Sequence, residues 1–178
     1  MKFFKLVFMA CISMVALSCN EEGSKVTSAQ NSIEYLDNYE NFRSFQEVIE
    51  PFKGKVLYVD LWATWCGPCK RQFTYKEGLK SYIKDKDVEL VYLSYDRPGQ
   101  EDKWKSFIDQ NNLTGFHAFA YPPIQNDIRE KFARVSNGRK GILLPTYIIV
   151  DRAGNVVNKN APRPSSGDQL YQEIAKYL

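Results

Sequence analysis

Two cysteines separated by two residues, Cys66 and Cys69, are the side chains of this sequence best suited to chemistry. The chain holds four cysteines, but Cys11 and Cys19 lie in an N-terminal segment with the order of parts of an export leader. A C-x-x-C pair closes too short a loop to act as an effective entropic staple. The pair is therefore expected either to react with disulfides or to bind a metal ion.

The surrounding pattern places this pair where a strand ends and a helix begins. Residues 56–62 form an almost continuous apolar run, which predicts a buried central strand, and residues 69–84 have amphipathic helical spacing. Unpaired amides and the dipole at a helix N-terminus favour a thiolate at Cys66, the form that attacks disulfides. Cys69, one turn later, could resolve the mixed disulfide, and Pro68 suits an early helical position.

The remaining elements predict an α/β fold with a central mixed β-sheet flanked by helices. Strands of both orientations are expected because strand–helix alternation is followed by a hairpin-type turn and a terminal helix. The expected helices cover 42–52, 100–111, 124–133 and 170–178, and the expected strands cover 88–95, 142–150 and 156–157.

The run Trp-Ala-Thr-Trp-Cys-Gly-Pro-Cys-Lys-Arg at residues 62–71 resembles the thioredoxin superfamily. The leader and the extended segment before a later proline loop look like its membrane-tethered TlpA/ResA-type branch. The resemblance covers roughly residues 42–178 and implies a thioredoxin-like fold. The sequence Asn-Ala-Pro-Arg-Pro-Ser-Ser at residues 160–166 also resembles a Bacteroidetes-type lipoprotein subgroup.

The resemblance implies a substrate-binding surface around the cysteines. Leu144-Pro145-Thr146 matches the family position of a cis-proline loop, whose backbone pairs with a bound peptide as an added strand. The alternative is an ordinary proline at the start of a strand. The predicted substrate-binding residues are Trp65, Gly67, Pro68, Leu144, Pro145 and Thr146.

Asp60 is the third predicted catalytic residue, with Cys66 and Cys69. It interrupts the apolar strand at the spacing of the buried aspartate of thioredoxin, and burial should raise its pKa so that it can exchange a proton with Cys69. The alternative is a solvated carboxylate at a wet strand edge.

Three positions depart from the family pattern. Gln72 stands where this branch often has an acidic residue, Thr74 replaces a helix-kinking proline, and Tyr92 aligns with the lysine that accompanies the buried aspartate in thioredoxin. These departures leave open how the surrounding residues set the reactivity of the cysteine pair.

The first residues are predicted to be an export signal. Lys2 and Lys5 precede the apolar run 6–17, which is shorter than the roughly 20 residues that span a bilayer. Ser18-Cys19 resembles a lipobox, which implies acylation of Cys19, although plain secretion is an alternative. The predicted organisation is a signal peptide at 1–18, a lipidated N-terminus and flexible tether at 19–40, and a thioredoxin-like domain at 41–178.

The function that follows is an exported thiol-disulfide oxidoreductase, lipid-anchored in the cell envelope. The Gly-Pro pair between the cysteines resembles reducing members, so the expected reaction is reduction of disulfides in other exported proteins. The protein is expected to act as a monomer and to receive its electrons from a membrane thiol donor. No cofactor is expected. The chain has 24 basic and 21 acidic residues, so it lacks the excess of positive charge that binding to nucleic acid needs, and no nucleic-acid partner is expected.

Two alternatives remain at this point. One is an oxidising or isomerising disulfide enzyme. The other is a copper-binding metallochaperone that uses Cys66, Cys69 and His117, the one histidine. Structural zinc is disfavoured because these three side chains are fewer than the four ligands that such a site needs.

Overall fold

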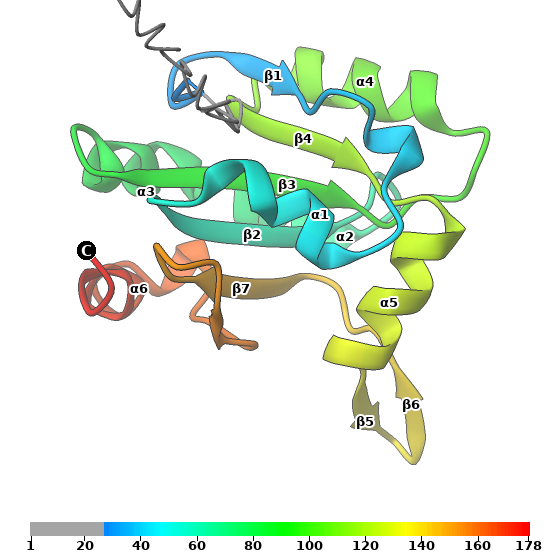
Figure 1. Cartoon of the computed structure of the whole chain (residues 1–178). Coiled ribbons are helices and arrows are strands. Elements are labelled where there is room, and N and C mark those ends of the chain that lie inside the picture. Colours follow the sequence, from blue (N-terminus) through cyan, green and yellow to red (C-terminus); the bar gives the residue numbers. More distant parts are fainter. Residues whose placement is uncertain (1–26) are drawn as a thin grey trace, which may run out of the picture.

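A six-stranded mixed β-sheet forms the centre of the computed structural model, which describes residues 27–178 (Figure 1). The strand order is β1-β4-β3-β2-β7-β8; β1 to β4 pair in parallel, whereas β7 runs antiparallel to β2 and β8 antiparallel to β7. The strands are β1 (Ile33–Tyr35), β2 (Val56–Trp62), β3 (Val88–Ser94), β4 (Gly115–Phe119), β7 (Thr146–Val150) and β8 (Val156–Asn158).

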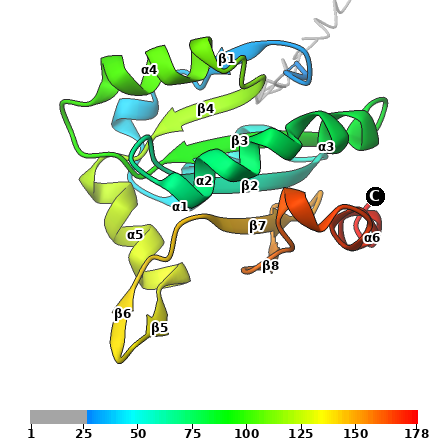
Figure 2. The ribbon, with the colours of Figure 1, turned by 180° about the vertical axis from the view of Figure 1, so that it is seen from behind.

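Helices cover both faces of the sheet, so the fold is the predicted α/β class (Figures 1 and 2). The α-helices are α1 (Phe45–Ile49), α2 (Gly67–Gln72), α3 (Lys76–Ile83), α4 (Glu101–Gln110), α5 (Pro122–Phe132) and α6 (Asp168–Ala175). Helices α2, α3, α4 and α6 pack on one face, and α1 and α5 pack on the other. Short 3₁₀ turns occur at Tyr39–Asn41, Glu50–Phe52, Phe73–Tyr75 and Pro164–Ser166.

Alternation along β2 decides which layer each of its side chains enters. All seven residues are buried because both faces of this strand are covered. Leu57, Val59 and Leu61 face α1 and α5, whereas Tyr58 and Trp62 face the layer that contains α2. Asp60 lies between Tyr58 and Trp62 in this alternation, so its carboxyl is directed toward the α2 side.

The central elements match the sequence predictions closely, but several segments differ. The expected helix at 69–84 is divided into α2, a 3₁₀ turn and α3. The third apolar run, 142–150, becomes a strand only from Thr146, after a cis Leu144-Pro145 bond. The sequence analysis missed β4, whose pairing with β3 and β1 comes from distant parts of the chain.

Ordered structure begins before residue 41, the predicted start of the domain. Residues Ile33–Tyr35, assigned from sequence to the tether, form β1, and Ala29 is buried. The backbone of this segment pairs with β4, with Ile33 opposite Gly115. The sequence of three residues, Ile-Glu-Tyr, is too short to predict this pairing. The predicted signal peptide and Cys19 lie outside the described residues. Within residues 27–178 no helix is long and apolar enough to cross a bilayer.

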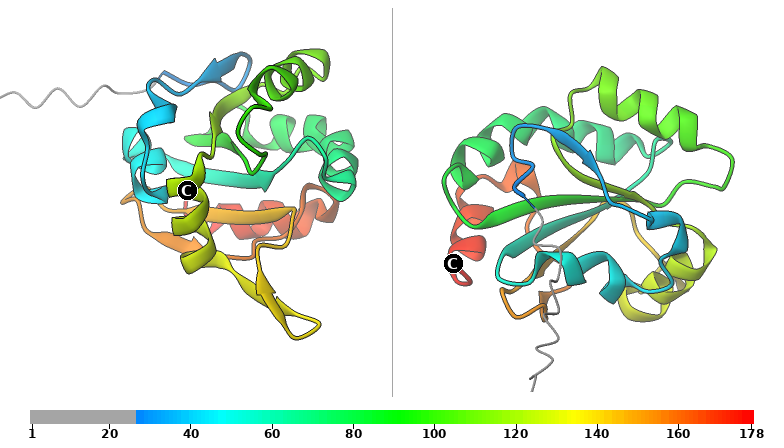
Figure 3. Two further views of the ribbon diagram at one scale, coloured as in Figure 1. Left: turned by 90° about the vertical axis from the view of Figure 1, so that its right-hand side faces the viewer. Right: turned by 45° about the horizontal axis from the view of Figure 1, so that its top comes forward.

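A second small sheet projects from the body as a hairpin between α5 and β7 (Figure 3). It consists of β5 (Arg134–Ser136) and β6 (Arg139–Gly141), joined by Asn137 and Gly138 at positive φ angles of 51° and 73°. Positive φ at both central residues is the geometry of a type I′ turn, for which Asn-Gly is the preferred sequence. The sequence analysis did not predict this hairpin.

Candidate active site

Cys66 and Cys69 lie at the beginning of α2 and form a disulfide, with their Cα atoms 5.3 Å apart. Cys66 is the N-cap residue, and its Sγ accepts a hydrogen bond from the Cys69 amide at 3.2 Å. The predicted early helical position of Pro68 is confirmed. This amide stabilises negative charge on Cys66 Sγ once the disulfide is reduced.

Exposure distinguishes the two sulfurs. Cys66 is 3% exposed and Cys69 is completely buried, so both cysteines are buried and Cys66 is the one nearer to the surface. Gly67 and Pro68 are exposed next to it, and the preceding Trp65 is 60% exposed, an unusual fraction for a large aromatic residue. The disulfide thus lies just beneath an exposed surface formed by Trp65, Gly67 and Pro68, with Cys69 the more deeply buried of its two residues.

Asp60 is buried. The proton-transfer prediction requires this burial, whereas the alternative of a solvated carboxylate at the strand edge is inconsistent with it. Asp60 is 4% exposed, and its Oδ1 atom has no hydrogen-bond partner. Burial raises the pKa of this carboxyl well above its usual range, and the nearby Tyr147 hydroxyl only partly offsets the effect. Burial therefore increases the affinity of this carboxyl for a proton.

Tyrosines surround this carboxyl. In the sheet register Asp60 pairs with Tyr92 on β3 and with Tyr147 on β7. Tyr58 stacks on Tyr147 with ring centroids 5.2 Å apart. Burial raises the pKa values of all three tyrosines, and the carboxyl adds to the effect, so they remain neutral neighbours.

A small cavity of about 10 Å³ adjoins Asp60 and has room for one water molecule. Gln72 and Lys76 contribute polar groups to its lining. Pro164 also lines the cavity, and the segment to which it belongs, residues 161–166, is called here the cover. Gln72 holds this cover, because its Oε1 accepts a hydrogen bond from the Ser165 amide at 3.1 Å.

Two further hydrogen bonds fix the cover to the sheet. The Tyr58 hydroxyl donates to the Pro162 carbonyl at 2.7 Å, and the Ala161 amide donates to the Tyr147 carbonyl at 2.9 Å. The proline-rich sequence noted at 160–166 is thus held against the cavity that adjoins Asp60. Sequence analysis did not connect these residues with the site.

The cis-proline loop lies at the same end of the sheet. The Leu144-Pro145 bond is cis, and the next residue, Thr146, pairs with Leu61 near the end of β2. Pro145 and Thr146 are buried and Leu144 is half-buried. This register directs residues 144–145 toward the segment between β2 and Cys66.

Asp96 is a functional candidate that the sequence analysis missed. Its Oδ2 accepts hydrogen bonds from the Thr64 amide at 2.9 Å and from Ser94 Oγ at 2.7 Å, and its Oδ1 accepts one from Thr64 Oγ1 at 2.8 Å. These bonds hold the turn that leads into Cys66. A carboxylate just after a strand that neighbours the cysteine-bearing strand was the available signal.

His117 does not join the cysteines. It is fully buried in β4, where its Nε2 hydrogen-bonds the Leu113 carbonyl at 2.7 Å and its ring stacks on Tyr92 with centroids 4.9 Å apart. Burial lowers its pKa to about 4. In the described part of the chain no three His, Cys, Asp or Glu side chains gather to hold a metal ion, so the grouping needed for the copper alternative is not formed.

Comparisons with known proteins agree with this geometry. The Redoxin family model matches residues 18–173. The thiol-disulfide oxidoreductase ResA of Bacillus thuringiensis subsp. konkukian is 28% identical over 130 residues, which cover 73% of this chain. The chain spans 65% of the length of that relative.

Solved structures give the same relationship. A candidate thiol-disulfide oxidoreductase from Bacteroides vulgatus shares 33% identity with a TM-score of 0.55 and is matched over 81% of its length, corresponding to 71% of this chain. The thioredoxin domain of a thiol-disulfide oxidoreductase from the same organism has a TM-score of 0.57 at 27% identity, covering 73% of this chain and 84% of that one. The predicted thioredoxin-like fold is confirmed.

Proposed function

The chain belongs to the Redoxin family, in the ResA-like branch of the thioredoxin superfamily, and from this premise we propose that it is a thiol-disulfide oxidoreductase that reduces disulfides in other proteins. One observation carries the proposal: Cys66, next to the exposed Trp65, is disulfide-bonded to the fully buried Cys69 on the sheet face toward which the buried Asp60 is directed.

The reaction begins with the reduced pair. The Cys66 thiolate attacks one sulfur of the substrate disulfide, forms a mixed disulfide and releases the other substrate sulfur as a thiolate. Cys69 transfers its proton toward the Asp60 carboxylate and attacks Cys66 Sγ, which releases the second substrate thiolate. Two electrons have then passed to the substrate, and the enzyme holds the Cys66–Cys69 disulfide.

Asp60 supports the second step because its surroundings raise its affinity for a proton. A carboxyl with an ordinary pKa would be a weak base toward a thiol, whereas desolvation raises the pKa of Asp60 and makes it a stronger base. The adjoining cavity has space for a water molecule that could relay the proton. In the return reaction Asp60 would protonate the departing Cys69 sulfur.

Substrate recognition would use the surface beside Cys66. Trp65, Gly67 and Pro68 offer exposed contact area, and the loop of Leu144, Pro145 and Thr146 offers backbone groups for an extended substrate segment. The polypeptide itself supplies all the redox chemistry of this scheme through two sulfurs.

The proposed setting is the cell envelope, where the exported chain is anchored through an acylated Cys19 and works as a monomer. Its disulfide would be reduced again by a membrane thiol donor. The leader pattern and the Gly-Pro pair between the cysteines support this direction and location.

Reduction potential and cysteine variants test the proposal. A reductase is expected to have a Cys66–Cys69 potential near the thioredoxin end of the scale, about −270 mV, and a value near about −120 mV would indicate an oxidant instead. Cys66→Ser should abolish reduction of a disulfide peptide. The matched Cys69→Ser variant should accumulate a mixed disulfide through Cys66. Full turnover by the Cys66 variant would refute the mechanism.

A further inference from the structure

The hairpin formed by β5 and β6, called here the basic arm (residues 134–141), has no part in the proposed reaction. It projects away from the sheet and helices (Figures 1 and 3). Its side chains face solvent on both surfaces, and Val135 near its base is 72% exposed. An exposed apolar residue on a short hairpin does not stabilise the domain core, so it is available for contact with another molecule.

The base of the basic arm is bonded to the cis-proline loop. Arg134 donates from Nη2 to Thr146 Oγ1 at 2.9 Å, and its Nη1 hydrogen-bonds the side chain of Asn160. Thr146 directly follows the cis Leu144-Pro145 bond and pairs with Leu61 at the end of β2. The arm therefore starts from the loop that borders the segment leading to Cys66.

The charged side chains in the basic arm are all positive. Residues 131–150 contain Lys131, Arg134, Arg139 and Lys140 and no acidic residue. Lys131 pairs with Asp127 at 2.5 Å, but Arg139 and Lys140 take part in no ion pair within residues 27–178. Two adjacent cations without a counter-charge are left at the exposed strand of the arm.

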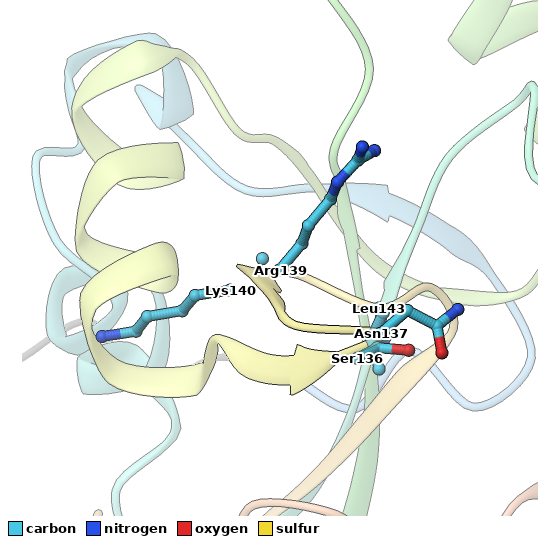
Figure 4. A pocket seen from close by; sticks show the side chains of 6 residues that line it. Ser136, Asn137, Arg139, Lys140 and Leu143 are labelled. Carbon is cyan, nitrogen blue, oxygen red and sulfur yellow. The ribbon is translucent and has the colours of Figure 1, made fainter.

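A hollow accompanies these cations (Figure 4). It has a volume of about 420 Å³ and is lined by Ser136, Asn137, Arg139, Lys140, Gly141 and Leu143. The Arg139 and Lys140 side chains extend in different directions from the strand, so they can contact carboxylates at separate points of a partner. Leu143, 39% exposed, adds an apolar contact two residues before Pro145.

We propose that the basic arm docks an acidic, extended segment of the substrate protein next to the disulfide that Cys66 attacks. This inference rests on the proposed function and names its substrate class: proteins with Asp or Glu residues flanking the target disulfide. Unpaired cations beside a reaction site raise the local concentration of acidic partners and speed their encounter. Attachment of the arm to the cis-proline loop favours a polypeptide over a membrane surface or a nucleic acid.

Three synthetic peptides test the proposal. They share one intramolecular disulfide and differ only in flanks of three Glu, three Gln or three Lys residues. The pre-reduced full-length chain is mixed with each peptide, and the second-order rate constant of peptide reduction is measured at low and at high salt. We expect the Glu peptide to react about three- to tenfold faster than the Gln peptide and the Lys peptide to react more slowly, with the differences reduced by salt.

Charge reversal on the arm identifies the source of the preference. The double variant Arg139→Glu and Lys140→Glu should favour the Lys peptide over the Glu peptide. The matched control, Lys103→Glu and Lys105→Glu on the exposed surface of α4, makes the same change in net charge far from the arm and should retain the wild-type order (Figure 1). A milder Arg139→Gln and Lys140→Gln variant should abolish the preference.

The outcomes separate this inference from the proposed function. Equal rates for the three peptides, or a preference that the control variant loses to the same extent, would overturn the docking inference while peptide reduction still supports the oxidoreductase. Failure to reduce any peptide would overturn both. Binding of the full chain to phosphatidylserine vesicles that requires Arg139 and Lys140, with no peptide preference, would assign the arm to a membrane surface and overturn the proposal.

Discussion

Replacing Asp60 by Asn should stabilise the protein at neutral pH while slowing its reaction. Asp60 is 4% exposed, its Oδ1 has no hydrogen-bond partner, and the residues paired with it in the sheet are tyrosines rather than cations. An ionised carboxylate in such a place is strongly disfavoured, and asparagine has almost the same shape without an ionisable group. The wild-type residue is therefore retained at the expense of stability.

The size and the sign of the effect follow from linkage. A raised pKa means that the folded state keeps a proton that the unfolded state has released, so wild-type stability falls as pH rises above about 4, the usual pKa of Asp. Each unit of pKa difference corresponds to about 1.4 kcal/mol. Because asparagine does not ionise, we expect Asp60→Asn to gain at least about 1.4 kcal/mol at pH 7.5 and almost nothing at pH 4.

Urea unfolding of the oxidised protein at several pH values measures the difference. Asp96→Asn is the matched control, because Asp96 is equally buried but accepts hydrogen bonds from Thr64 and Ser94. Weakening these bonds should destabilise the protein by about 1–3 kcal/mol, the opposite sign. The same Asp60→Asn sample should reduce a disulfide peptide more slowly at neutral pH, with a changed pH profile.

Two results would refute this reasoning. If Asp60→Asn lost stability at pH 7.5, the carboxyl would be stabilised by partners that outweigh its burial. If the gain were the same at pH 4 and pH 7.5, ionisation of Asp60 would play no part in it. An unchanged pH profile of peptide reduction would remove the proton-transfer role while leaving the stability argument intact.

Three further predictions test the surroundings of the site. Gln72→Glu places a second carboxyl at the cavity beside Asp60, so the pH profile of peptide reduction should shift upward by about one unit, whereas an unshifted profile would mean that the two groups do not interact. Burial lowers the pKa of His117 to about 4, so the free energy of unfolding should decrease as pH falls from about 6.5 to 4. In urea unfolding, His117→Asn should make this decrease smaller by about 3 kcal/mol, and an equal decrease in both proteins would contradict the prediction. Gly115→Ala should cost about 2–4 kcal/mol, because φ is +135° and the new Cβ would lie 2.9 Å from the Leu90 carbonyl oxygen; a loss below 1 kcal/mol in thermal unfolding would show that the backbone can relax there.

The parts of the fold that local pattern determines were predictable. Strand β2 was placed at its observed bounds because burial on both faces produces an uninterrupted apolar run between glycines. Strand β4 contains Gly115 and His117 within five residues and was missed, since its identity as a strand comes from pairing with β3 and β1. The hairpin carried a usable signal, because Asn137-Gly138 favours a type I′ turn, but its flanking strands are short and polar.

The site was predictable to the same extent. The cysteines and Asp60 lie within ten residues of one another, so their spacing is visible in the sequence. The contact of Thr64 with Asp96 spans 32 residues, and that of Gln72 with Ser165 spans 93. Such partners are brought together only by the packing of the sheet, and nothing in the local sequence of either segment indicates the other.

The departure at Gln72 changes how the proton-transfer group is controlled. An acidic residue at this position would titrate together with Asp60, and the two would share apparent pKa values. The amide cannot ionise, and its oxygen is occupied by the Ser165 backbone, so it keeps the cover of segment 161–166 in place without adding charge. The proton affinity of Asp60 then depends mainly on its burial, and any change that loosens the cover should lower its pKa and slow the step that needs Cys69 as a thiolate. This dependence makes the cover, although distant in sequence from the cysteines, part of the machinery that sets their reactivity.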